Sequence, residues 1–325
     1  MEHVEPIEQK YHLGLVDELE STDIFLYAGT ISCEGFTKLS SELEKRNIDG
    51  TKGDKVVLII NTFGGDPHAG YKMARLLQYE YQNLTVAIPE MCKSAGSLIA
   101  IAANEIIYGP LGELGPLDIQ TRKRDEMGEQ SSTLDIFKAL DNLQTRVIES
   151  FRHYVTDIKY GSGLNTKLAS DIASTLSESL IKPISAQIDP VKLGEQKRAL
   201  SIAFEYAERL NQKSNNLKES SLNKLIEGYP SHSFVIDYYE AVQLFHEVRK
   251  VKTEVEYILN GLALNTIQKL QQEIHEQSFI ACDFTKLAKQ VLQQQTNINN
   301  EEDPNSDETA SNEDVKNILD AVGTD

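Results

Sequence analysis

The chain has 325 residues, 40% of them hydrophobic, and is therefore long enough to bury a full core as one large domain or as a domain with appendages. Its 50 acidic and 32 basic residues give a formal net charge of −18, with no basic patch, which argues against binding to nucleic acid. The cysteines Cys33, Cys92 and Cys282 are too few and too widely spaced for a disulfide framework or a CxxC metal site, and they suit a reducing compartment.

The amino-terminal residues carry no recognisable targeting signal. The start MEHVEPIEQK is acidic and lacks the basic and apolar regions of a signal peptide. The longest apolar run, around SLIAIAANEII, is too short and too interrupted to span a bilayer. We therefore expect a cytoplasmic protein with no membrane segment, in which residues 1–21 form an amino-terminal extension.

The first half of the chain alternates strand-like and helical segments. The predicted strands are DIFLYAGTI, KVVLIINTF, LTVAIPEMC and EIIYG. The predicted helices are GFTKLSSELEKRN, PHAGYKMARLLQYEYQ and SAGSLIAIAAN. This alternation is typical of βαβ units, so the sequence predicts an α/β fold with a mostly parallel sheet and flanking helices.

Helical periodicity dominates the second half. Apolar residues recur at helical spacing from Thr133 to about Arg209, which indicates several long amphipathic helices. Further helices are predicted at SLNKLIEG, DYYEAVQLFHEV and VEYILNGLALNTIQKLQQEI, and FVI between the first two is predicted to be a short strand. Residues 251–293 are accordingly interpreted as a C-terminal helical segment.

The last part of the chain is polar and acidic. Residues 301–325 hold nine acidic residues against Lys316 alone, a net charge of −8. With so little apolar surface to bury, residues 294–325 are predicted to be a disordered tail.

The segment NTFGGDPHAG, residues 61–70, runs from an apolar strand through paired glycines into a helix. Glycines at such a turn let the backbone approach a substrate and direct N–H groups at developing negative charge. A purely structural turn also uses such glycines, and the spacing fits neither a P-loop nor a dinucleotide fingerprint.

The segment CKSAGSLIAIAAN, residues 92–104, has the same strand-to-helix form and starts its helix at Ser94. A serine there can act as a nucleophile, with the N–H of Ala95 available to an oxyanion. It can equally be a helix N-cap, a position that serine favours. Lys93 is expected to point away from Ser94 at the end of the strand. Since consecutive βα turns of a parallel sheet meet at its carboxyl edge, the two segments are expected to lie together.

GGDPHAG followed by KSAGSLIAIAANEIIYGPLGELGPLD resembles the Clp protease proteolytic subunit, signal peptide peptidase A and, most closely, the serine dehydrogenase proteinase family. The downstream segments PISAQIDPVKLGEQKRALSIAFEYAERL and YPSHSFVIDYYEA also resemble that family. The resemblance covers residues 22–250 and implies a hydrolase domain of the Clp protease/crotonase-like fold there. It implies a serine peptidase or hydrolase that cleaves peptide or acyl bonds through an acyl-enzyme.

By this resemblance Ser94 is the nucleophile, and Gly65 and Ala95 supply the N–H groups of the oxyanion hole. The Clp subunit has a histidine one βα unit after its nucleophile, but the matching GELGPLDIQ contains none, and Asp118 is its nearest polar residue. The segment YPSHSFVIDYYEA offers His232 instead. We therefore predict that His232 is the general base and that Asp118 orients it.

Four alternatives stay open. In signal peptide peptidases a lysine activates the serine, and Lys138 occupies a comparable region here. The same fold also serves crotonase-type enzymes that act on acyl-coenzyme A thioesters, and a chain that has lost its triad would be a non-catalytic scaffold. Cys92 is a rival nucleophile, although its place at the end of a strand predicts burial.

We expect no metal, because the histidines and cysteines show no ligand spacing, and we expect no cofactor. The expected substrate is a peptide or protein. The number of amphipathic helices exceeds what one sheet needs as cover, so we also expect a homo-oligomer. The sequence leaves open whether an ATPase partner is required.

Overall fold

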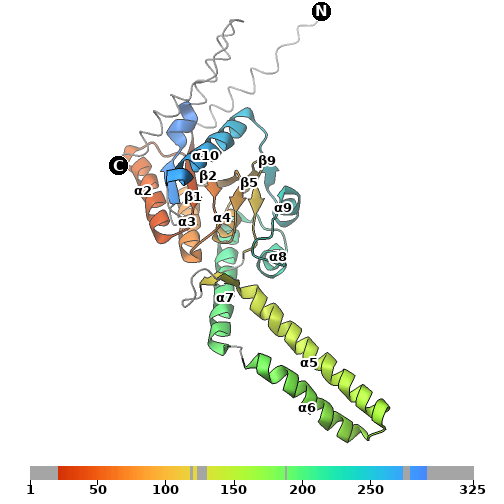
Figure 1. Ribbon diagram of the computed structural model, residues 1–325. Coiled ribbons are helices and arrows are strands. Elements are labelled where there is room, and N and C mark those ends of the chain that lie inside the picture. Colours follow the sequence, from red (N-terminus) through yellow and green to blue (C-terminus); the bar gives the residue numbers. More distant parts are fainter. Residues whose placement is uncertain (1–20, 118–119, 123–129, 187–188, 274–278, 291–325) are drawn as a thin grey trace, which may run out of the picture.

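The computed structural model describes residues 21–117, 120–122, 130–186, 189–273 and 279–290, which form a central sheet with helices on both faces (Figure 1). The sheet has six strands in the order β10-β1-β2-β3-β5-β9. Its strands are β1 (Thr22–Gly29), β2 (Lys55–Asn61), β3 (Asn83–Ile88), β5 (Glu105–Tyr108), β9 (Val248–Lys250) and β10 (Phe279–Asp283). All pairs are parallel except β1 with β10, which confirms the predicted α/β fold with a mostly parallel sheet.

The centres of β1 and β2, residues 24–28 and 56–60, are apolar because both faces of the sheet are buried there. Alternate residues of each strand face opposite layers of the core. On one face, residues such as Leu58 and Ile60 pack against α2 (Cys33–Asp49), α3 (Pro67–Glu80) and α4 (Ala95–Ile101). On the other, Ile24 and Ile59 pack against α10 (Glu254–Glu273).

The helix after β2 begins at Pro67 as predicted, whereas the helix after β1 begins at Cys33, two residues before the predicted start. The side chain of Ser32 accepts a hydrogen bond from the N–H of Gly35 and caps α2. Asp66 caps α3 in the same way through the N–H of His68, and Pro67 occupies the first helical position. The start of α3 therefore fixes the turn that precedes it.

The long helices α5 (Thr133–Ser162) and α6 (Thr166–Ser185) pack against each other and extend away from the sheet, and α7 (Pro190–Ser214) returns to it (Figure 1). A short hairpin of β7 (Gln120–Arg122) and β8 (Gln130–Ser132) precedes α5. Ala203, Ala207 and Leu210 of α7 are buried in the main core. The helices predicted in this region are therefore present, and among their described side chains only those of the second half of α7 belong to the main core.

The C-terminal part holds two strands that the helical pattern did not predict. The expected helix over 237–248 ends earlier, as α9 (Tyr238–Leu244), because Phe245 is extended and buried in the core, and β9 follows at the edge of the sheet. After α10, β10 pairs with β1 and closes the opposite edge. FVI, predicted as a strand, contributes only an isolated bridge from Ile236 to Leu114. The domain boundaries stay predictions.

Candidate active site

The first of the two turns follows β2 and is held on both sides. The N–H of Ile31 donates to the carbonyl of Gly64 (2.9 Å), and the N–H of Asp66 donates to the carbonyl of Ile31 (2.8 Å). Within the turn, the N–H of Gly64 donates to the hydroxyl of Thr62 (2.9 Å), which itself donates to the carbonyl of Gly29 (2.6 Å). These contacts fix the backbone on either side of Gly65.

Glycine is required at both central positions of this turn. Gly64 has φ 108° and Gly65 has φ 150°, which side chains rarely tolerate. A Cβ at Gly65 would lie 2.1 Å from the carbonyl oxygen of Ile31. The paired glycines therefore let the turn pack directly on Ile31, as their place in the sequence indicates.

The second turn lies beside the first. The predicted strand over 84–92 is divided into β3 and the short β4 (Met91–Cys92), separated by Pro89 and Glu90. Strand β4 leaves the central sheet and runs parallel to Thr62, whose carbonyl accepts from the N–H of Lys93 (3.0 Å). The residue before Ser94 is thereby hydrogen-bonded to the residue two before Gly64.

Ser94 sits in a strained backbone conformation between β4 and α4. Its φ of 54° and ψ of −116° lie outside the regions that non-glycine residues prefer. Its side chain makes no N-cap hydrogen bond, although its place before α4 is that of an N-cap. Strain of this kind gathers at functional sites, and the capping role that serine often has at this position is not filled here.

Ser94 and Gly64 are in direct contact. A Cβ added to Gly64 would lie 2.6 Å from the Cβ of Ser94 and 3.2 Å from its Oγ. Gly96 is similarly close to its neighbours, because an added Cβ would meet the Cγ2 of Thr62 at 2.6 Å. The structure therefore brings the two glycine-containing turns together at the carboxyl edge, as the sequence predicted.

The backbone N–H groups of Gly65 and Ala95 are among those in these turns that have no acceptor in the described part of the chain, and those of Phe63, Ala69 and Ser97 have none there either. Gly65 is exposed in the first turn, and Ala95 directly follows Ser94. The neighbouring N–H groups of Gly64, Asp66 and Gly96 are all hydrogen-bonded within the protein. The donors of Gly65 and Ala95 flank the contact between Gly64 and Ser94, as an oxyanion hole requires.

The segment with His232 reaches this edge through β6 (Glu113–Leu114). Strand β6 pairs with β4, and its Leu114 exchanges both backbone hydrogen bonds with Ile236 at 3.0 and 2.9 Å. His232 is half-buried in the loop between α8 (Ser221–Glu227) and α9. Three segments distant in sequence thus lie side by side: the strand before Ser94, β6 and the loop that carries His232.

A contact that the sequence did not predict also joins these segments. The ammonium of Lys93 forms an ion pair with Glu113 (2.7 Å) and donates to the carbonyl of Ser233 (3.4 Å). The Lys93 side chain is 9% exposed, and its stem packs on Gly115, where an added Cβ would lie 2.9 Å from the Cβ and Cγ of Lys93. Lys93 therefore contacts the residue that follows His232.

The other predicted site residues are placed less fully. Asp118 lies outside the described residues, although Leu117 before it is buried and its N–H donates to the carbonyl of Leu225 (2.9 Å). Lys138 lies in α5 near its start, and its side chain is outside the described part of the structure. The roles of both residues therefore stay predictions.

Cys92 is confirmed as buried, with no exposed surface. Burial raises the pKa of its thiol well above the ordinary range, which disfavours the thiolate that a nucleophile needs. Among the residues that the structure describes, no three His, Cys, Asp or Glu side chains gather to hold a metal ion. Burial and the raised pKa therefore disfavour Cys92 as the rival nucleophile.

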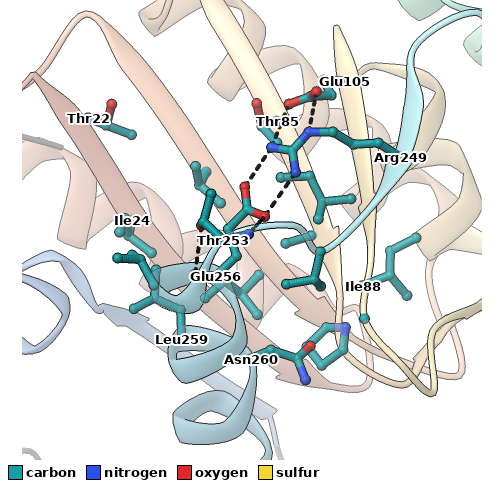
Figure 2. A pocket seen from close by; sticks show the side chains of 18 of the residues that line it. Thr22, Ile24, Thr85, Ile88, Glu105, Arg249, Thr253, Glu256, Leu259 and Asn260 are labelled. Atoms are coloured by element: carbon teal, nitrogen blue, oxygen red, sulfur yellow. Dashed lines mark hydrogen bonds and ion pairs between the residues drawn. The ribbon is translucent and has the colours of Figure 1, made fainter. Parts of the chain in front are cut away.

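A concave region separate from these turns lies on the sheet face that α10 partly covers (Figure 2). It has a volume of about 300 Å³, and its wall includes Ile24, Thr85, Ile107 and Leu259. Arg249 lies in it between Glu105 and Glu256, to which it donates at 2.7 Å each (Figure 2). No residue of the two glycine-containing turns lines this pocket, which is thus separate from Ser94.

Hydropathy of the helices bears on membrane insertion. No helix within the described ranges combines the length and the apolar character that crossing a bilayer would require.

Comparison with known proteins gives a family match for about two-fifths of the chain. Residues 35–158 match the family model of ClpP-like SDH-type serine proteinases. The uncharacterized protein MJ1495 of Methanocaldococcus jannaschii is 31% identical over 131 residues, which are 36% of this chain and 44% of that protein. The chain thus matches less than half the length of this relative.

Solved structures give a weaker likeness. The 1510-N membrane-bound stomatin-specific protease is 14% identical with a TM-score of 0.31, over 72% of this chain and 98% of that one. The ClpP protease catalytic domain from Plasmodium falciparum is 10% identical with a TM-score of 0.34, over 78% and 97% of the two chains. The family assignment therefore depends on the family model. Over residues 35–158, which hold both glycine-containing turns and Ser94, the resemblance to the ClpP-like SDH-type serine proteinase family is confirmed.

Proposed function

We propose that this protein is a serine peptidase in which Ser94 attacks the carbonyl of a peptide or protein substrate. Attack forms an ester between the Ser94 oxygen and the acyl group, and the amine leaves with a proton from the general base. Water then attacks the ester, releases the acid and restores the serine. The N–H groups of Gly65 and Ala95 would stabilise the oxyanion in both steps.

The observation that carries this proposal is the contact between the two turns. Ser94 has a positive φ, and its Oγ would lie 3.2 Å from a Cβ on Gly64. The unused N–H donors of Gly65 and Ala95 lie one residue from this contact on either side. A structural turn has no need of a strained serine next to two unused donors, whereas acyl transfer uses both a serine hydroxyl and such donors.

For the base we propose His232, oriented by Asp118, with Lys138 as the alternative. The pairing of Leu114 with Ile236 supports His232, because it connects the histidine loop to the strand beside β4. An imidazole accepts the serine proton in its neutral form and titrates close to neutral pH, which suits this role. A lysine in that role would have to lose its own proton first.

A fluorophosphonate probe tests the proposal directly. The probe phosphonylates an activated serine, and peptide mapping of the full chain should locate the adduct on Ser94. Ser94→Ala should remove the labelling. A crotonase-type enzyme or a scaffold without a triad would stay unlabelled, and an adduct on Ser97 or another serine would contradict the assignment.

We further propose that the chain forms a homo-oligomer. The helices α5 and α6 extend from the sheet and expose large apolar residues: Ile148, Leu168, Leu176, Leu180 and Ile184. A second copy of the chain could cover these residues. Light scattering at micromolar concentration should give a multiple of the chain mass, and a monomer would contradict this proposal.

A further inference from the structure

Lys93 is a buried cation beside the proposed nucleophile, and acyl transfer does not require it in any role described above. Its residue is 7% exposed, and a lysine is rarely buried to this degree unless it is paired. Its partners are Glu113 on β6 and the carbonyl of Ser233 in the histidine loop. The ammonium acts as a donor to both groups, which is the opposite of a base.

We propose that Lys93 is a positioning residue that couples Ser94 to His232. Lys93 precedes Ser94 and its backbone is fixed by the carbonyl of Thr62 (3.0 Å), so its main chain belongs to the nucleophile turn. Its side chain ends on Ser233, which follows His232. One residue therefore connects the two turns that must hold nucleophile and base at hydrogen-bond distance. This inference depends on the proposed function and on His232 as the base.

The local packing shows that the stem of Lys93 follows a defined path. Gly115 leaves room for it, since an added Cβ would lie 2.9 Å from both Cβ and Cγ of Lys93. The carboxylate of Glu113 is 2.7 Å from the ammonium, and its side chain is 25% exposed. The ion pair thus holds the ammonium over β6, within reach of the loop. The hydrogen bonds between Leu114 and Ile236 hold the far end of the same loop, and Lys93 contacts it next to His232.

A second ion pair joins the two helices that flank the loop, and it offers a matched control. Lys224 on α8 pairs with Glu240 on α9 (2.8 Å), and both ends of the loop are close to this pair because Tyr229 also donates to Glu240 (2.9 Å). Within the described residues, Lys224 forms no hydrogen bond or ion pair with the turn that holds Ser94. Lys224→Met therefore removes a lysine–glutamate pair next to the same loop and leaves the contacts of Lys93 unchanged.

The test measures fluorophosphonate inactivation of the full-length protein, with the maximal rate constant separated from probe affinity. Lys93→Met keeps an apolar stem of similar length and should lower the rate constant by about tenfold to a hundredfold, with affinity nearly unchanged. Lys93→Arg should recover most of the rate, because a guanidinium can still donate to Glu113 and to the Ser233 carbonyl. Lys224→Met should stay within about twofold of the wild type.

The decisive arm is a double-mutant cycle with His232→Ala. If Lys93 acts through His232, Lys93→Met should have no further effect once the imidazole is gone. A Lys93→Met protein that labels like the wild type, or effects that multiply in the double variant, would overturn the coupling. Since a lone Glu113 carboxylate can destabilise the fold, Lys93→Met/Glu113→Gln provides a second variant without either charge. That double variant should be equally slow, and wild-type rates in it would overturn the inference.

The outcomes separate this inference from the proposed function. A wild type that the probe does not label at Ser94 overturns the proposed function, and the coupling falls with it. A wild type that is labelled, together with unaltered Lys93 variants, overturns the coupling alone.

Discussion

The turns around Ser94 and the pocket around Arg249 lie on the same sheet but satisfy their polar groups in opposite ways. In the pocket Arg249 donates to two carboxylates, and Glu256 also accepts from the backbone N–H of Lys252 (2.7 Å). At the turns, the N–H groups of Gly65 and Ala95 have no acceptor within the described chain, and Ser94 is strained. The charged groups of the pocket are paired within the protein, whereas we propose that a substrate accepts from the donors at the turns. Polar content alone therefore does not distinguish the two regions, but donors without an acceptor beside a strained serine do.

The largest effect should come from removing the base. His232→Ala should lower the probe-labelling rate by about 10²–10⁴-fold, the usual contribution of a general base, while Lys138→Ala should leave it nearly unchanged. Labelling kinetics on the two purified variants provide the measurement. Near-normal labelling in His232→Ala with a large loss in Lys138→Ala would replace the histidine by a serine–lysine dyad.

The next effect tests the glycine turn. Gly65→Ala should lower the labelling rate by about a hundredfold, because its Cβ would meet the Ile31 carbonyl and displace an oxyanion donor. The backbone strain should also cost about 1–3 kcal/mol of unfolding free energy. Gly50→Ala is the control, since Gly50 also has positive φ (65°) but open space around its Cβ position. Its labelling should be normal, and a loss equal to that of Gly65→Ala would show that strain alone is responsible.

The pocket gives the converse prediction. Arg249→Met leaves Glu105 and Glu256 without their cation and should lower the unfolding free energy by about 1–3 kcal/mol. Because no turn residue lines the pocket, the labelling rate per folded molecule should not change. Urea unfolding and probe kinetics on the same sample measure both quantities. A specific loss of labelling would show that the two regions are coupled.

The smallest effect concerns acid. Burial opposes ionisation of Glu256, but hydrogen bonds from Arg249 and the backbone N–H of Lys252 outweigh it and lower its pKa. The folded state therefore binds fewer protons than the unfolded state between the two pKa values. The resulting stability is present above the ordinary glutamate pKa and is lost as pH falls through the folded value. Glu256→Gln should be less stable than the wild type at neutral pH, and urea unfolding should show a smaller loss of its stability as the pH falls. An unchanged loss would assign the acid sensitivity to other carboxylates.

The sequence predicted the parts of the site that depend on local order. A strand that enters paired glycines, and a second that enters a serine before a small-residue helix, are both readable from short segments, and the structure brings them together. Lys93 and Ser233 are 140 residues apart, and their contact has no periodic signature. The edge strand β10 was missed for a similar reason, because its pairing with β1 joins opposite ends of the domain. Such long-range contacts depend on tertiary packing that local propensity does not report.

The central claim is that Ser94 attacks a carbonyl whose oxygen binds to Gly65 and Ala95. A crystal structure of the phosphonylated protein would test this most directly, because the adduct mimics the tetrahedral intermediate. The account predicts a bond from phosphorus to the Oγ of Ser94, with the phosphoryl oxygen about 2.7–3.1 Å from the N atoms of both Gly65 and Ala95. A phosphoryl oxygen directed away from both N–H groups, or an adduct on another residue, would contradict it.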